Sequence, residues 1–119
     1  MKSTQEIATR LVELCRAGDY ATCYAELFAP HAVSIEPDSA PEPRRAEGMD
    51  AIKKKGEVWQ SMIEEVHGGS VGDPVVVGNW FACQMMADWT MKGQGRSKME
   101  ELCVYKVENG KVVSEQFFF

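Results

Sequence analysis

Three glutamates and a tyrosine in this sequence have side chains suited to proton transfer. Glu36 ends a short stretch, residues 31–36, in which side chains alternate with the period of a strand. Ser34 lies two positions before it. Glu101 and Tyr105 share one apolar stretch, and Glu115 lies in the last one. A carboxyl group among apolar side chains has its charged form disfavoured, so its pKa rises toward the range where it can accept and return a proton. If the fold turns these residues inward, general acid–base chemistry is expected.

Other kinds of site have less support. His31 and His67 are far apart in the sequence, and neither has Cys or paired acidic neighbours at the spacing of metal ligands. We interpret His67 as a helix-end residue, because the helix dipole favours an imidazolium there. The cysteines show no Cys-x-x-Cys spacing and are interpreted as reduced core thiols, namely Cys15, Cys23, Cys83 and Cys103. We therefore expect no metal and no cofactor.

Composition limits the partners of the chain. Its 119 residues suit one domain over 1–119, and its formal net charge of −5 comes without a basic stripe. Lys53, Lys54 and Lys55 form the only basic cluster, which we interpret as a solvated helical face. Nucleic acid is therefore not expected as a partner. The chain shows neither an apolar segment of membrane-spanning length nor an N-terminal signal, which predicts a cytoplasmic protein without membrane contact.

The first third of the chain carries clear helix signals. Ser3 and Glu6 fit a capping box, and apolar residues at helical spacing predict a helix over 4–17. Asp19 can cap a second, shorter helix that Pro30 stops. Residues 31–36 then alternate with the period of a strand, which puts Ser34 and Glu36 on one face.

A proline-rich segment and a long helix are expected next. Residues 37–47 contain three prolines and no apolar periodicity, so the segment is either a mobile lid or a plain connector. A helix of about five turns is predicted from Met49 to His67, ended by Gly68 and Gly69. Its inner face is formed by Ile52, Gly56, Trp59, Ile63 and Val66.

The second half of the chain is predicted to be all strand. Glycine-containing turns separate stretches near 71–78, 80–92, 97–107 and 111–119. This order predicts an α+β fold, with helices on one side of a curved antiparallel sheet.

Four local phrases, together with this element order, resemble the SnoaL-like branch of the nuclear transport factor 2-like superfamily. They are Ala17-Gly18-Asp19-Tyr20, Leu27 to Val33, Gly48 to Ile52 and Val104 to Val113. The phrases mark the fold and contain no catalytic signature. The resemblance implies a cone in which the sheet and the long helix enclose a pocket, within a superfamily that includes isomerases, cyclases, dehydratases and domains without activity.

Strand phase then assigns side chains to that pocket. The odd-numbered residues of 80–91 are entirely apolar, so this face is expected to point inward. Pairing extends the inward face to Met99, Glu101, Cys103, Tyr105, Glu115, Phe117 and Phe119. From these positions we predict Glu36, Glu101 and Tyr105 as catalytic. The predicted ligand-binding residues are Ser34, Trp59, Met85, Trp89, Cys103, Glu115 and Phe117.

Several interpretations of the glutamates remain open. Glu36 precedes Pro37, which is similar to the segment where ketosteroid isomerases of this superfamily carry their general-base aspartate. Glu36 could equally bond the backbone, Arg44 or Arg45. Glu101 and Glu115 could instead form surface cross-strand pairs, with Lys111 or Lys98 as partners.

The same resemblance weakens the case for a steroid isomerase. The family's two oxyanion donors align with Leu11 and Cys103, and a leucine donates no hydrogen bond while a thiol donates weakly. Tyr24 or Tyr105 would have to substitute. Two functions remain, either an enzyme that uses a pocket glutamate on a small apolar or cyclic molecule, or a domain that binds ligand or dimerises without catalysis.

A homodimer is expected through the outer face of the sheet. Even-numbered positions would leave that face apolar and in need of cover, through Leu102, Val104, Val112 and Phe118.

Overall fold

Two capped helices begin the chain, as the sequence predicts. In the computed structural model, which describes residues 1–119, α1 (Thr4–Arg16) starts with a full capping box between Ser3 and Glu6. α2 (Tyr20–Leu27) is capped by the Asp19 side chain, which accepts a hydrogen bond from the Thr22 backbone N–H at 3.2 Å. Both caps satisfy backbone donors that would otherwise have no intrahelical partner.

Seven strands follow and form one mixed sheet. They are β1 (Phe28–Ile35), β2 (Arg45–Glu47), β3 (Ile63–Val71), β4 (Val75–Val77), β5 (Trp80–Met91), β6 (Gly95–Glu108) and β7 (Lys111–Phe118). Their order is β2-β1-β7-β6-β5-β3, with β4 also paired to β5. β1 runs parallel to β7, so the prediction of a wholly antiparallel sheet is wrong for this one pair. Parallel neighbours need a long crossover, and here α3 and five strands lie between the two.

The long helix is shorter than predicted. α3 (Met49–Met62) ends where β3 begins at Ile63, so Gly68 and Gly69 lie inside a strand and do not end a helix. Pairing with β5 provides β3 with a ladder of backbone hydrogen bonds, with Val66 opposite Trp89. A Cβ atom on Gly69 would lie 2.8 Å from the Met86 carbonyl oxygen, so a glycine permits this close approach of the two strands.

A register shift between Lys106 and Val107 changes which side chains of β7 face inward. Val112 is consequently 0% exposed and belongs to the core, so its predicted place on the outer face is wrong. Beyond the shift the predicted phase returns, and Glu115 pairs with Tyr105. An extra residue in one strand reverses side-chain alternation, which a period-2 pattern does not reveal.

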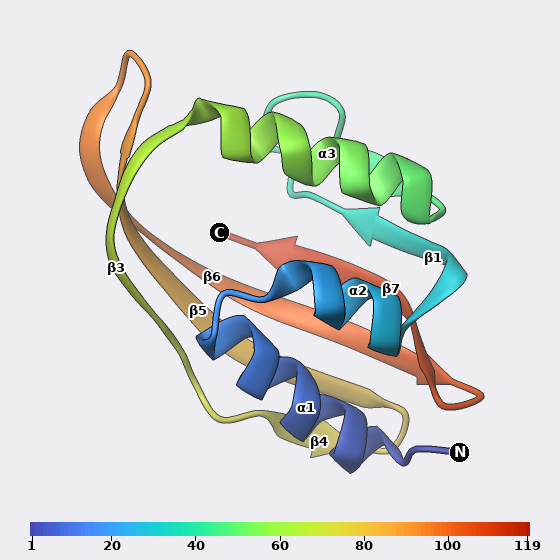
Figure 1. The fold of residues 1–119 in the computed structure, drawn as a ribbon. Helices are drawn as coiled ribbons and strands as arrows, with labels where there is room; N and C mark the ends of the chain where they lie inside the picture. Colours follow the sequence, from blue (N-terminus) through green and yellow to red (C-terminus); the bar gives the residue numbers. More distant parts are fainter.

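The helices cover the inner face of the sheet in two parts. Figure 1 shows β3, β5 and β6 bending along one side of the molecule, with α1 and α2 over one part of the sheet and α3 over another. The fully buried core lies mainly under α1 and α2 and extends to Ile52 on α3, and its largest side chains are Phe81, Ile7, Leu11, Leu27 and Ile52. The predicted α+β architecture, three helices against a curved and unclosed sheet, is confirmed. None of the three helices is long and apolar enough to cross a bilayer.

Candidate functional site

The inner faces of β5 and β6 change character along their length. Phe81 and Cys83 are buried, as are the residues opposite them, Tyr105 and Cys103. The next inward pair, Met85 and Glu101, is only partly buried. The predicted inward phase of these strands is therefore confirmed, and the interior becomes more exposed toward the end that α3 covers.

Lys55 lies at the centre of a polar cluster in this interior. Its ammonium nitrogen is 2.8 Å from Glu36 Oε1 and donates a short hydrogen bond of 2.5 Å to Ser34 Oγ. The side chains of Lys55 and Glu36 are only 7% and 8% exposed. A buried charge needs a partner to offset its lost hydration, and this ion pair supplies one for both residues.

The interpretation of the lysine cluster as a solvated face is thus wrong for Lys55, although Lys53 and Lys54 are exposed. Helical spacing contains the signal that sequence reasoning missed. Lys55 is three residues after Ile52 and four before Trp59, so it lies on the same stripe of α3 as these two inner residues. A lysine can occupy such a stripe when its ammonium finds an acceptor, and Glu36 lies at the end of β1 to provide it.

Glu115 lies deeper than the ion pair. The residue is 3% exposed, and its Oε1 atom has no hydrogen-bond partner. Burial raises the pKa of Glu115 to about 7, while the Ser34 hydroxyl and the Lys55 charge oppose that rise. Near neutral pH the site therefore holds a carboxyl group that shares its time between the protonated and ionised forms.

Glu101 has a similar pKa in a more open position. Burial is again the main cause, with help from the Glu36 charge, and it raises the pKa of Glu101 to about 7. The Cys103 thiol donates a weak hydrogen bond to Glu101 Oε1 at 3.5 Å. Because Glu101 is only partly buried, it is the carboxyl group of the cluster best able to exchange a proton with a bound molecule.

Aromatic side chains surround these polar groups. The Phe117 ring centroid lies 5.4 Å from the Lys55 nitrogen, and the Trp59 and Trp89 rings stack with centroids 6.4 Å apart. Tyr105 stacks on Phe81 at 4.7 Å, and burial raises the pKa of its hydroxyl well above the ordinary value. Tyr105 therefore keeps its proton and can act only as a hydrogen-bond donor or acceptor.

The alternative partners considered for the glutamates are not those found. Arg44 and Arg45 pair with Glu42 and Glu47, leaving the side chain of Glu36 to Lys55. Lys111 donates to the Glu26 carbonyl oxygen, so the surface pairs considered for the other two glutamates are wrong.

His67 also differs from its predicted place. It lies on β3, where its Nε2 atom is 2.7 Å from Thr90 Oγ1, because α3 ends before it. Segment 37–47 contains the short strand β2 within the predicted connector. All cysteines are free and buried, as predicted.

The two positions aligned with oxyanion donors supply no strong hydrogen-bond donor. Leu11 is 1% exposed and belongs to the core, and the Cys103 thiol is already directed at Glu101. Burial and the Glu115 charge raise the pKa of Tyr24, whose ring packs edge-on against Phe28. Lys55 is consequently the strongest hydrogen-bond donor in this interior.

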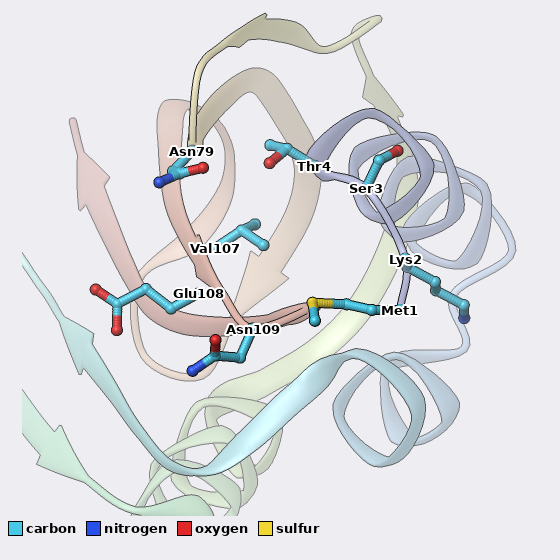
Figure 2. A pocket seen from close by; sticks show the side chains of 9 residues that line it. Met1, Lys2, Ser3, Thr4, Asn79, Val107, Glu108 and Asn109 are labelled. Atoms are coloured by element: carbon cyan, nitrogen blue, oxygen red, sulfur yellow. The ribbon is translucent and has the colours of Figure 1, made fainter.

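Two surface hollows lie away from the cluster. One, of about 420 Å³, is formed where the start of the chain meets the β6–β7 turn, and Figure 2 shows Val107 at its centre between Asn79 and Asn109. The other, of about 480 Å³, lies beside α1 near Arg16 and Asp73. Neither contains a predicted site residue. No group of three or more His, Cys, Asp or Glu side chains is arranged to hold a metal ion.

Comparisons with known proteins give the family. The family model for the SnoaL-like domain matches residues 2–119. A proposed SnoaL-like polyketide cyclase from Mesorhizobium loti is 36% identical, with 99% of this chain and 100% of that chain covered and a TM-score of 0.92. An NTF2-like protein from Burkholderia thailandensis shares the fold at 17% identity, with 99% and 91% of the two chains covered and a TM-score of 0.85.

A protein from Catenulispora acidiphila with a ketosteroid isomerase-like fold, solved in complex with trimethylamine, is 16% identical, with 98% and 87% of the two chains covered and a TM-score of 0.74. Among curated protein sequences, none matches this chain. The match over nearly the whole length, together with the 36% identity to a solved relative, shows that this chain belongs to the SnoaL-like domain family.

Proposed function

We propose that this protein binds a small apolar or cyclic molecule in the interior beside α3 and moves a proton on it by general acid–base catalysis. The observation that carries the proposal is the convergence of Glu36, Lys55, Glu101 and Glu115, from four elements, among apolar side chains. Isolated buried carboxyl groups are costly, so several in one place favour a functional explanation over a structural one.

Glu101 is the proposed proton carrier. Its pKa of about 7 suits a group that must both accept and return a proton near neutral pH, and its partial exposure leaves it accessible. Glu36 is less suited to this role, because accepting a proton would mean giving up its ion pair with Lys55. In this scheme Glu36 keeps the ammonium in place, while Ser34 and Glu115 complete the polar wall.

The proposed reaction type is proton transfer beside a carbonyl group, as in isomerases and cyclases. The Glu101 carboxylate takes a proton from the carbon next to the carbonyl, leaving an enolate, and the new carboxyl group returns the proton to another carbon. Trp59, Met85, Trp89 and Phe117 are the proposed apolar walls for the substrate, since these types suit flat apolar ligands. The polyketide cyclase description of the Mesorhizobium loti relative is consistent with a ring in the substrate or in the product.

A thermal-shift screen followed by a turnover assay tests the proposal. Apolar carbonyl compounds, steroids and aromatic polyketide-like molecules are screened, because a ligand at 100 times its dissociation constant adds about 2.7 kcal/mol to stability. On a hit that turns over, Glu101→Gln should slow the reaction by about 100-fold or more. Glu100→Gln changes the exposed neighbouring residue and should leave the rate unchanged. Full activity in Glu101→Gln would refute the role of this residue.

A second candidate function is ligand binding without turnover. It is favoured by the residues at the two aligned oxyanion positions, Leu11 and Cys103, which cannot supply two strong donors. Incubation of catalytic amounts of protein with each hit, followed by mass spectrometry of the ligand, separates the two candidates. Chemically altered ligand supports the enzyme, and unaltered ligand supports the binding module.

We further propose that the outer sheet face forms a homodimer. Leu102 on β6 and Phe118 on β7 are cross-strand neighbours and are 47% and 46% exposed, so this apolar pair is uncovered in the single chain. Sedimentation should give a dimer mass that Leu102→Glu converts to a monomer mass. A wild-type monomer at all concentrations would contradict this expectation.

A further inference from the structure

The Lys55 ammonium has one more N–H group than it has hydrogen-bond acceptors around it. An ammonium group has three N–H donors, and Lys55 uses one on Ser34 and one on Glu36. Glu36 is the only carboxylate within 4.0 Å of the Lys55 nitrogen, so neither Glu101 nor Glu115 receives the third proton as an ion pair. The third N–H therefore has no hydrogen-bond acceptor, and the nearby Phe117 ring, whose centroid lies 5.4 Å from the nitrogen, supplies a cation–π contact but no acceptor oxygen.

Glu115 leaves a second polar group unsatisfied. Its Oε1 atom is buried without a partner, so this oxygen lacks an acceptor when it carries the proton and lacks a donor when it does not. Burial, the Glu36 charge and the Glu101 charge favour the protonated form, while Lys55 and Ser34 oppose it. Tyr24, Tyr105 and Cys103 also lie near these carboxyl groups. Burial raises the pKa of both tyrosines, and a hydrogen bond with Cys83 followed by burial raises that of Cys103, so they too keep their protons.

We propose that Lys55 is an anion-binding group, and that the ligand of this interior carries an oxygen that is negative or becomes negative, such as an enolisable carbonyl or a carboxylate. Lys55 then supplies from α3 the strong donor that the positions of Leu11 and Cys103 lack. The inference rests on the proposed function, because both concern the same interior. It adds the chemical class of the ligand, and it adds Lys55 as a residue that touches the ligand.

Charge arithmetic supports an anion over a cation. With Glu101 and Glu115 protonated, the charges of Lys55 and Glu36 cancel, and Lys55 keeps one N–H without an acceptor. A buried site with surplus donors is completed by an acceptor oxygen, and a preorganised cation in an apolar surrounding stabilises developing negative charge strongly. A cationic ligand would instead require at least one of these carboxyl groups to ionise among apolar side chains.

Three probes with the same apolar ring test the inference: benzoate, benzyl alcohol and benzylamine, which are anionic, neutral and cationic near neutral pH. Their affinities for the wild-type protein are measured by calorimetry at about pH 6 and about pH 8. Benzoate should bind at least about tenfold more tightly than benzylamine. A tenfold difference in affinity is about the typical contribution of one hydrogen bond to a charged group. The benzoate affinity should fall at the higher pH, because Glu101 and Glu115 then compete as anions.

Variants of the lysine assign the preference to one side chain. The double variant Lys55→Met/Glu36→Gln removes both charges together, so no buried charge is left unpaired, and it should bind benzoate no better than benzyl alcohol. Lys55→Arg should keep part of the preference. Lys54→Met, which changes the exposed neighbour, should leave all three affinities as in the wild type.

Each other outcome overturns the inference. Benzylamine binding as tightly as benzoate would show that the carboxyl groups dominate the cluster. A benzoate preference that survives in the double variant would assign the anion site to other residues. Binding of benzyl alcohol alone would overturn the inference and leave the proposed interior site standing, whereas failure of all three probes to bind would count against both.

Discussion

The two ends of the interior have the same strand pattern and different packing. Under α1 and α2, Phe81 and Cys83 are 1% and 3% exposed, and their neighbours are close-packed. Beside α3, the same alternation on β5 continues through Met85 and Trp89, which remain partly exposed. The first end has its apolar surface covered by two helices, while the second has one helix and holds the charged cluster.

This difference separates stability from function. Close packing of apolar groups provides folding energy, whereas a half-open interior with buried carboxyl groups costs energy that the packed end must offset. Glu101 and Glu115 keep raised pKa values because the open end provides apolar surroundings without a second cation. We therefore expect substitutions at the packed end to change stability most, and substitutions at the open end to change proton and ligand binding.

The largest expected effect is at the packed end. Phe81→Ala should lower the free energy of unfolding by about 3–5 kcal/mol, because it removes a fully buried ring that stacks on Tyr105. Met85→Ala, on the same face but partly exposed, should cost clearly less. Urea denaturation of the two variants measures the difference, and equal losses would contradict the division into two ends.

The next effect concerns the buried ion pair at the open end. Lys55→Met should lower the free energy of unfolding by about 3 kcal/mol, because Glu36 would be buried without a partner. Adding Glu36→Gln should recover most of this loss. Denaturation of both variants is the measurement, and a single variant as stable as wild type would mean that solvent already reaches Glu36.

An effect of similar size depends on pH and on Glu115. Its folded-state pKa of about 7 lies above the ordinary carboxyl value, so the native state binds more protons than the unfolded state between these values. The stabilising contribution is fully present below the ordinary pKa and is lost as pH rises through about 7. Glu115→Gln cannot ionise, so it should be about 3 kcal/mol more stable than wild type at about pH 8 and should gain little at low pH.

The pH dependence is measured by denaturation across that range, with Glu100→Gln as the exposed control. Stability of the wild type that rises through pH 7 and is unaffected by Glu115→Gln would contradict the assignment.

The smallest expected effect separates backbone from side-chain contributions at the open end. Gly69→Ala places a Cβ atom 2.8 Å from the Met86 carbonyl oxygen, whereas a Cβ atom on Gly68 meets nothing within 4 Å. Gly69→Ala should therefore lower the free energy of unfolding by about 1–2 kcal/mol, with little change for Gly68→Ala. Equal stability of the two variants would mean that β3 shifts freely against β5.

Much of the fold could be predicted because local signals agreed with the tertiary structure. The Ser3 capping box, the Asp19 cap and the apolar alternation on β5 each correspond to the observed elements. Two predictions are wrong for the same reason, because the structure of each segment depends on a partner strand that is remote in the sequence. Ile63 begins a strand because β5 is available to pair with it, and Val112 turns inward because of a register shift on the neighbouring strand.

The carboxyl groups of the candidate site could be predicted from the sequence, but its cation, Lys55, could not. Strand phase placed Glu101 and Glu115 inward, since period-2 alternation holds through that part of the sheet. Lys55 was missed because lysine usually marks a solvated helical face, and only the approach of β1 to α3 shows that Ser34 and Glu36 can receive its ammonium. A buried ion pair between distant elements leaves no periodic trace in the sequence.

Two carboxyl groups that hold protons near neutral pH in a partly exposed interior are central to the proposed chemistry. Carbon-13 NMR of protein labelled at the glutamate side-chain carboxyls follows their titration directly. Two signals should titrate near pH 7, one lost in Glu101→Gln and the other in Glu115→Gln. Titration of both groups at the ordinary carboxyl pKa would contradict the account, because a fully hydrated pair of carboxylates has no special capacity to carry a proton.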